Sequence, residues 1–305
     1  MVEKLTSVSD AVSSIPAGSS LSFGGFGHYG HPLALVREII RQRIANLTLY
    51  AIAECWPAEL LTAAGLVRHI DMSNLMFEGL GRVRAICRAV ENGEITTDDH
   101  SHLGLSLRLL AAGWGVPFLP IHTMAGSDLE HIQSGDKPKF ARIPSPFGDE
   151  WTGVVSALQP DVAIIHVHQA DTQGNGIIHG QISVVDAQVR AARRVILSTE
   201  ELVDGADVVA HNQLTVIPGF LVDTVVHTPY GSHPGGVYGR YDEDQELLEE
   251  YYQASRSPDT LADWLTAWVY DLGDHIDYLD QVGSQRLARV VVDPELKLSR
   301  GRGEY

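Results

Sequence analysis

The sequence predicts an α/β fold with an open, mainly parallel sheet and helices on both faces. Short apolar runs alternate with segments of helical periodicity over most of the 305 residues. Such alternation favours parallel pairing, because each helix returns the chain to the same end of the sheet. With 44% hydrophobic residues and a mean hydropathy of −0.02, the chain can also bury a large core.

In the first half, each predicted helix has apolar residues at helical spacing or an identifiable end. SVSDAVSSI begins with the possible caps Ser7 and Ser9, Pro32 suits a first helical turn, and Gly65 and Gly93 suit C-terminal caps. The predicted helices are SVSDAVSSI, 32–42, 57–65, 82–93 and 102–113, and the predicted strands are 20–23, 47–53, 66–72 and 116–124.

The second half repeats the alternation and then becomes helical. Strands are predicted at 161–171, 194–202 and 222–231, and helices at 186–192, 244–256 and 261–282. Length alone is compatible with two domains, but single α/β domains also reach this size. We therefore predict one domain over residues 1–305, with an irregular excursion at 127–151 and a helical C-terminal part at 244–290.

Charge and cysteine content exclude several functional classes. The 39 acidic and 22 basic residues give a net charge of −17, which disfavours binding to nucleic acid. The two cysteines, Cys55 and Cys87, form neither a disulfide framework nor a CxxC pair. The first residues lack the apolar core of a signal peptide, and no stretch approaches a membrane span of about 20 apolar residues. We expect a reduced, cytoplasmic protein without a membrane partner.

The stretch SFGGFGHYGHP (22–32) lies between a predicted strand and a predicted helix, where backbone N–H groups can face a ligand. Gly25, Gly27 and Gly30 match the letters of a dinucleotide-binding G-x-G-x-x-G. That pattern also requires an acidic residue about 20 positions further on. Glu54 comes 29 residues after Gly25, and no Walker lysine is present. A dinucleotide site and a glycine turn without a ligand both remain open at this point.

Other polar groups suggest chemistry but have structural alternatives. Glu54 follows a predicted parallel strand, where a carboxylate can act as a nucleophile or base, or can simply cap the next helix. Glu91 in VENGE belongs to a helix end. His166 and His168 share one face of a strand, where a core or pocket role is favoured over metal binding, so we predict no metal site. The polar stretch TDDHSH (97–102) precedes an apolar helix and is typical of a helix N-cap. The serine-hydrolase motif GxSxG is absent.

The glycine stretch in its context, AGSSLSFGGFGHYGHP (17–32), resembles the signature of the family I CoA-transferases. Gly24-Gly25-Phe26, Gly30 and Pro32 fit the signature, whereas Ala17 and Ser22 depart from it. The resemblance is greatest to the α subunits of the glutaconate type and runs the length of the chain. Its longest matches are VPFLPIHTMAGSDL (116–129), PGFLVDTVVHTPYGSHPGGVYGRYD (218–242) and WVYDLGDHIDYLDQVGSQRL (268–287).

The resemblance implies an α subunit that moves CoA between an acyl-CoA and a small carboxylate. In the family, a glutamate of the β subunit forms an anhydride and then a glutamyl-CoA thioester. The resemblance thus implies a β-subunit partner in an α2β2 assembly, coenzyme A as substrate and no tightly bound cofactor. The loop Gly24, Gly25, Phe26 and Gly27 would donate N–H groups to the oxyanion or to CoA.

The alignment and the loop positions also give a set of pocket candidates. We further hypothesise that Glu54 faces the cleft. The α subunits of steroid ring-opening hydrolases are also similar, and a CoA-thioester or C–C hydrolase is therefore the alternative activity. Their functional glutamate aligns with His100 and is absent here, which counts against direct transfer of the ring-opening chemistry. A CoA- or nucleotide-binding regulatory subunit is the non-enzymatic alternative. The pocket candidates are His28, Tyr29, Glu78, His100, Ser101, Met124, Ser127 and Gln169.

Overall fold

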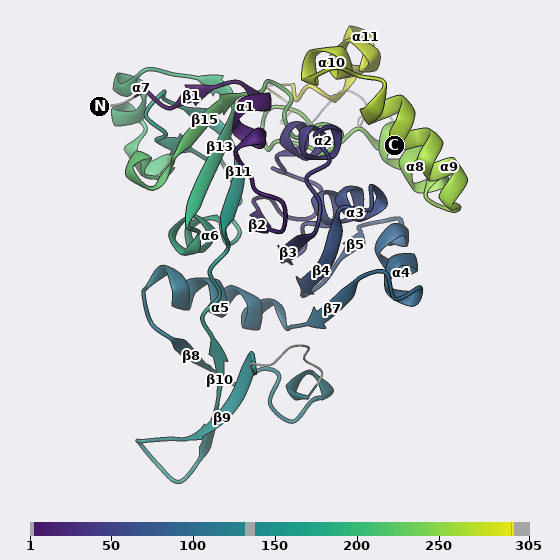
Figure 1. Cartoon of the computed structure of the whole chain (residues 1–305). Coiled ribbons are helices and arrows are strands. Elements are labelled where there is room, and N and C mark those ends of the chain that lie inside the picture. The colour runs from purple at the N-terminus through teal and green to yellow at the C-terminus, as the bar shows by residue number, and fades with distance from the viewer. Residues whose placement is uncertain (1–2, 132–137, 294, 296–305) are drawn as a thin grey trace.

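Eight parallel strands form the centre of the computed structural model, in the order β1-β15-β13-β11-β2-β3-β4-β7 (Figure 1). Two short antiparallel strands, β12 and β14, extend from β11. The structure describes residues 3–131, 138–293 and 295, so residues 132–137 of the predicted excursion lie outside it. The strands of this sheet are β1 (Leu5–Thr6), β2 (Ser20–Phe23), β3 (Leu47–Ala51), β4 (Val67–Met72), β7 (Thr96–Asp99), β11 (Val162–Ala170), β12 (Gly176–Ile177), β13 (Arg194–Leu202), β14 (Thr215–Ile217) and β15 (Thr224–His227).

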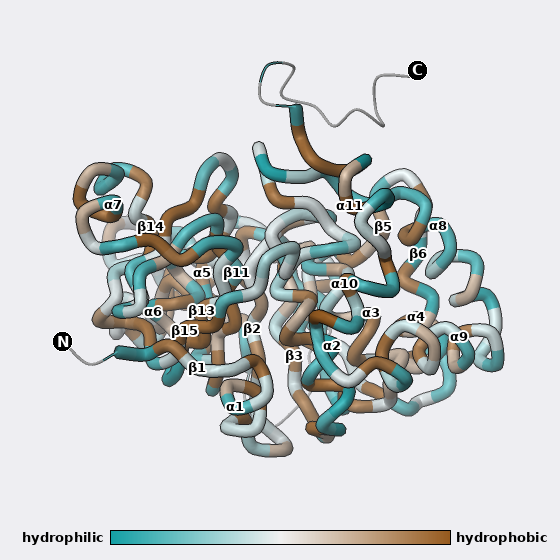
Figure 2. The backbone as a smooth tube through the Cα atoms, turned by 90° about the horizontal axis from the view of Figure 1, so that it is seen from above, coloured by the Kyte–Doolittle hydropathy of each residue, from teal (hydrophilic) through white to brown (hydrophobic). Residues whose placement is uncertain are grey.

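Helices cover both faces of the sheet, as predicted. Along β3, Leu47 and Leu49 enter the core shared with α2 and α3, whereas Tyr50 packs toward α5 and α6. In Figure 2 the central strands, such as β13 and β15, are mainly hydrophobic. The helices are α1 (Val8–Ser13), α2 (Leu33–Arg41), α3 (Cys55–Ala63), α4 (Arg84–Glu91), α5 (His102–Gly113), α6 (Val185–Ala191), α7 (Gly205–Ala210), α8 (Gln245–Ala254), α9 (Pro258–Leu265), α10 (His275–Val282) and α11 (Ser284–Val290).

The order of the strands reverses between β2 and β11. From β2 the chain proceeds outward through β3, β4 and β7, whereas β11, β13 and β15 extend in the opposite direction. Loops at the carboxyl ends of two such strands diverge and leave a crevice, which is where open α/β sheets bind ligands. The glycine stretch follows β2 directly, so the fold places it at this crevice.

The predicted excursion at 127–151 is more regular than expected. It contains β9 (Phe140–Pro144) and the start of β10 (Trp151–Ser156), which pairs with both β9 and β8 (Phe118–Ile121) in a separate antiparallel sheet. Figure 1 shows β9 and β10 projecting away from the main sheet. Strand β8 lies within the predicted strand 116–124, whereas Pro144 obscured β9 in the sequence, because proline is typical of strand edges and loops.

Two further elements differ from the sequence-based expectations. TDDHSH was predicted as N-cap chemistry, but Thr96–Asp99 form the edge strand β7 and only Ser101 caps α5, accepting the Gly104 N–H at 2.9 Å. The predicted helix 261–282 is interrupted by a π-helical turn, Thr266–Tyr270, and restarts where the Asp274 carboxylate caps α10. No helix in the described ranges is long and apolar enough to cross a membrane.

Candidate active site

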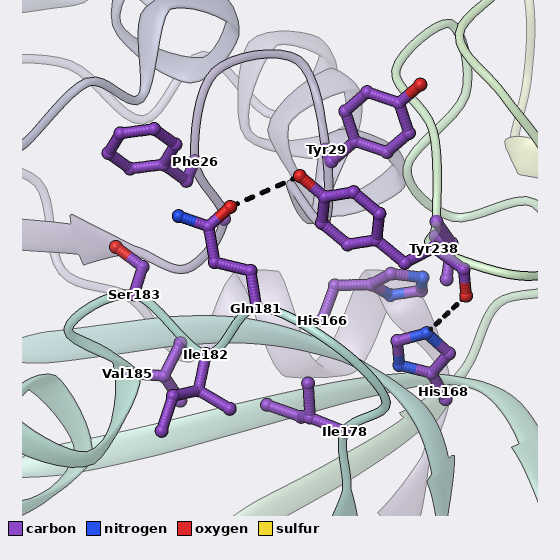
Figure 3. Close-up of a pocket in the computed structure, with 13 residues that line it drawn as sticks. Phe26, Tyr29, His166, His168, Ile178, Gln181, Ile182, Ser183, Val185 and Tyr238 are labelled. Carbon is purple, nitrogen blue, oxygen red and sulfur yellow. Dashed lines mark hydrogen bonds between the residues drawn. The ribbon is translucent and has the colours of Figure 1, made fainter.

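A pocket lies at the sheet crevice, between the glycine stretch, the end of β11 and two later loops (Figure 3). Its walls combine backbone, aromatic rings, aliphatic side chains and two histidines, so it offers an apolar cavity with few polar groups. The residues that line it are Gly25, Phe26, Tyr29, Gly30, His166, His168, Ile178, Gln181, Ile182, Ser183, Val185, Val237 and Tyr238.

The glycines let the loop fold tightly over the sheet. Gly25 has φ +107° and Gly27 has φ +61°, in the region that favours glycine. A Cβ atom at Gly25 would lie 2.3 Å from His31 Nδ1 and 2.7 Å from the Tyr29 carbonyl oxygen. Position 25 therefore requires glycine for two reasons: its positive φ, and the lack of space for a side chain between His31 and Tyr29.

The hydrogen bonds of the loop leave two of its N–H groups unused. The N–H groups of Gly24, Phe26 and Gly27 donate to the carbonyls of Ile164 (2.9 Å), Tyr29 (2.9 Å) and Ala53 (3.2 Å) respectively. Those of Tyr29, Gly30 and His31 donate to the Phe26 carbonyl, the Gly236 carbonyl and Ser232 Oγ. Within the described ranges, the N–H groups of Gly25 and His28 have no such acceptor. Of the predicted donors Gly24 to Gly27, only Gly25 is therefore available to a ligand.

One wall of the pocket is a stacked pair of tyrosines. The rings of Tyr29 and Tyr238 lie 4.5 Å apart and nearly parallel, and Tyr238 Oη donates to Gln181 Oε1 at 3.2 Å (Figure 3). His168 Nδ1 accepts the His179 N–H (3.2 Å), so its proton is on Nε2, which donates to the Tyr238 carbonyl (2.9 Å). The sequence indicated the two strand histidines but gave no sign that Gln181 and Tyr238, from two later loops, line the same pocket.

Both ring nitrogens of His166 belong to a buried hydrogen-bond network. Its Nε2 lies 2.7 Å from Glu200 Oε1 and its Nδ1 lies 2.8 Å from Ser198 Oγ. Glu200 also accepts from the N–H groups of Tyr230 and Gly231 and from Tyr241 Oη. Burial alone would raise the pKa of Glu200, but the bonds from His166 and the other donors lower it. The ring nitrogens of His166 therefore contact protein groups, which supports the pocket interpretation of this histidine.

The candidates His28, Tyr29 and Glu78 gather at the glycine loop. His28 is buried, with Nδ1 bonded to the Glu243 carboxylate and Nε2 accepting the Glu78 N–H at 3.2 Å. The Glu78 side chain is exposed, and its carboxylate would lie 3.3 Å from a Cβ atom at Gly27. Tyr29 lines the pocket itself, whereas His28 anchors the loop to the two segments that carry Glu78 and Glu243.

The candidates Ser101, Met124 and Ser127 lie at the N-terminal end of α5, where His102 faces Phe26 across 6.3 Å. Ser101 Oγ contacts Thr123 Oγ1, and Ser127 Oγ donates to the Met124 carbonyl. Met124 is buried in the small core of the antiparallel sheet. These three residues support the rim of the crevice rather than line the pocket.

The candidate His100 is buried in a cluster of charged groups. Its Nε2 lies 2.8 Å from Asp71 Oδ1, and Lys139 Nζ bonds Asp71 (2.7 Å) and Asp98. His69, Asp71 and Asp98 have the mutual spacing of metal ligands, but the Lys139 ammonium already lies between the two carboxylates. The cluster therefore ties the segment that leads into β9 to strand β4 and the edge strand β7.

Glu54 and Gln169 do not face the pocket. Glu54 was expected to face the cleft, but it is 1% exposed and its carboxylate accepts the Ile52 N–H. Burial raises the pKa of Glu54 well above its usual value. Its side chain turns inward because the chain reverses at Ala53 (φ +66°), which places Glu54 behind Gly27. Gln169 donates to Glu201 at 3.0 Å, near the end of β11.

Three buried histidines should make the folded protein less stable at acid pH. Burial lowers the pKa of His31 and of His168 from 6.5 to about 4, and that of His275 to about 3. Between pH 6.5 and about 4 the unfolded chain therefore binds protons that the folded chain does not, and stability falls as pH falls. Each histidine contributes about 1.4 kcal/mol per pH unit in that window. Urea midpoints at pH 7.5 and 5.0 test this, and His275→Phe should reduce the difference, whereas equal midpoints would contradict it.

Comparisons with known proteins agree with this geometry. Residues 5–228 match the family model described as coenzyme A transferase. The chain is 33% identical to the A-type subunit of glutaconate CoA-transferase from Acidaminococcus fermentans, over 97% of each chain. The crystal structure of the glutaconate enzyme superposes with a TM-score of 0.91, at 31% identity over 97% of this chain and 98% of the other.

Other similar proteins are longer than this chain or are named for other activities. An uncharacterized protein of Archaeoglobus fulgidus is 35% identical over 95% of this chain, which spans 65% of that relative. The decarboxylase AibA/AibB superposes with a TM-score of 0.75, at 32% identity over 87% of this chain and 100% of the other. The IpdA component of a cholesterol ring-cleaving hydrolase from Rhodococcus jostii is 27% identical, over 90% and 94% of the two chains.

Proposed function

The chain belongs to the coenzyme A transferase family, and from this premise we propose that it is the A-type subunit of a heteromeric CoA-transferase. The proposed enzyme moves CoA from an acyl-CoA to a small carboxylate, with coenzyme A as a substrate rather than a resident cofactor. The partner is a B-type subunit, in an α2β2 assembly.

The observation that carries the proposal is a pair of unused backbone N–H groups in the glycine loop. Gly25 and His28 each present a backbone N–H without an acceptor in the described part of the chain, and Gly25 lines the pocket. Two such donors match the need of a thioester carbonyl, whose oxygen becomes negative when a nucleophile attacks. The buried carboxylates nearby, Glu54 and Glu200, are engaged by backbone N–H groups and are poorly placed to attack.

The proposed reaction therefore takes its nucleophile from the partner. A glutamate carboxylate of the partner attacks the thioester carbon, and the CoA thiolate leaves to give a mixed anhydride. The thiolate then attacks the glutamyl carbonyl, which releases the first acid and forms a glutamyl-CoA thioester. The incoming carboxylate repeats the steps in reverse order and leaves as the new acyl-CoA. Each tetrahedral intermediate places its oxyanion at the N–H groups of Gly25 and His28.

Dependence on an acceptor acid tests the proposed function. The complex of this chain with its partner is purified and given glutaconyl-CoA, 3-oxoadipyl-CoA or succinyl-CoA, with and without acetate. We expect at least one donor to yield acetyl-CoA when acetate is present, and free CoA to form at least ten times more slowly than that acetyl-CoA, with or without acetate. Release of free CoA without acetate as fast as the conversion of the donor with acetate would overturn the proposal in favour of hydrolysis. Release of CO2 without acyl transfer would overturn it in favour of decarboxylation.

A further inference from the structure

His31 lies directly behind the glycine loop and has no exposed surface. Its Nδ1 lies 3.0 Å from the Gly24 carbonyl oxygen and its Nε2 lies 2.8 Å from the Gly27 carbonyl oxygen. Burial lowers its pKa to about 4, so at neutral pH the ring has one N–H and donates to one of these carbonyls at a time. The other carbonyl remains in contact with the ring.

The two carbonyls that His31 contacts belong to the same peptide groups as the two unused N–H groups. A trans peptide group is planar, with its C=O and N–H pointing in opposite directions. The Gly24 carbonyl shares its plane with the Gly25 N–H, and the Gly27 carbonyl shares its plane with the His28 N–H. Both carbonyls face the ring, which donates to one of them at a time, so the Gly25 and His28 N–H groups point away from His31, and Gly25 lines the pocket.

The position of the imidazole is itself well defined. The His31 backbone N–H donates to Ser232 Oγ at 3.0 Å, and the next residue, Pro32, is the N-cap of α2. Gly25 packs against the ring so closely that a Cβ atom there would overlap Nδ1. The ring thus restrains the Gly24–Gly25 peptide by packing as well as by hydrogen bonding.

We propose that His31 is a positioning residue for the acyl-transfer step, which aims the Gly25 and His28 N–H groups at the oxyanion. The residue touches no substrate and acts through the loop. The inference rests on the proposed function, because the two N–H groups need an oxyanion to bind. On this inference, one side chain outside the pocket, that of His31, sets the orientation of the Gly25 and His28 N–H groups.

Four variants of His31, assembled with the partner chain, test the inference. His31→Phe fills the site without a donor, and the smaller His31→Leu does the same if the Phe chain does not assemble. His31→Asn places an amide N–H near the Gly24 carbonyl, and His31→Gln places one near the Gly27 carbonyl. We expect the Phe or Leu variant to lose roughly 10²–10³-fold in kcat, with the KM for acyl-CoA within threefold. At least one amide variant should recover tenfold or more of that loss.

His275→Phe is the matched control, because His275 is also buried and its ring nitrogens lie near the Pro229 carbonyl oxygen and the Arg37 guanidinium rather than near carbonyls of the glycine loop. Its kcat should stay within threefold of the wild type even where its thermal stability falls.

A His31→Phe or His31→Leu variant with near-normal kcat, or His31→Asn and His31→Gln variants as slow as His31→Phe, would overturn the inference. If the wild-type complex transfers no CoA, the proposed function has failed. Normal transfer by both the wild type and the Phe variant would refute the role of His31 alone.

Discussion

Gly25→Ala is expected to lower the kcat of the assembled enzyme by roughly 10²–10³-fold, the loss typical of removing one oxyanion donor. The added Cβ atom would lie 2.3 Å from His31 Nδ1 and 2.7 Å from the Tyr29 carbonyl oxygen, at a φ of +107°. The loop must shift to relieve both contacts, and the Gly25 N–H then turns away from the crevice. Steady-state kinetics with a fixed acyl-CoA and acceptor measure the effect.

Gly18→Ala is the control for backbone strain alone. Gly18 has a similar positive φ of +81°, but a Cβ atom there meets nothing within 4 Å. The substitution should cost about 1–2 kcal/mol of stability and leave kcat within twofold. Equal kcat losses for Gly18→Ala and Gly25→Ala would show that strain, rather than the placement of a donor, explains the effect at Gly25.

Lys139→Met is expected to lower the free energy of unfolding by about 3–5 kcal/mol, because it removes the ammonium group that two buried carboxylates share. The Lys139 ammonium bonds both Asp71 and Asp98, which are nearly inaccessible to solvent. Burial alone would raise the pKa of Asp71, but His100, Arg108 and Lys139 together lower it, so its carboxylate is charged. Equilibrium unfolding in urea at pH 7.5 measures the change.

Arg190→Met provides a matched comparison for Lys139→Met. Arg190 pairs with Asp186 at 2.8 Å one helical turn away, and both side chains are substantially exposed. An exposed pair of this kind contributes about 0.3–0.5 kcal/mol, so its loss should be small. A change below 1 kcal/mol for Lys139→Met as well would contradict the role assigned to the buried cluster.

The main sheet could be predicted because its sequence signals are local. The apolar run of β11 and the helical spacing of α2 each fix an element without knowledge of its neighbours, and both appear where expected. Edge strand β7 was missed because TTDD is polar, and it pairs only by lying beside β4. The antiparallel strand β9 depends in the same way on contacts with a distant segment, β10.

The site was predictable in its location but not in its details. The glycine stretch placed a donor loop after β2, and the structure has it at the sheet crevice. Which N–H groups remain available depends on acceptors far away in the chain, such as the carbonyls of Ala53, Ile164 and Gly236. The inward turn of Glu54 is also a tertiary effect, since it depends on the reversal at Ala53.

The most direct test of the central claim is the intact mass of both chains after the complex meets acyl-CoA without an acceptor acid. We predict that the partner chain gains CoA as a thioester, with loss of water, and that the mass of this chain does not change. The claim is that this chain supplies donors and its partner supplies the nucleophile. A CoA adduct on this chain, for example at Glu78, whose exposed carboxylate lies beside Gly27, would contradict it.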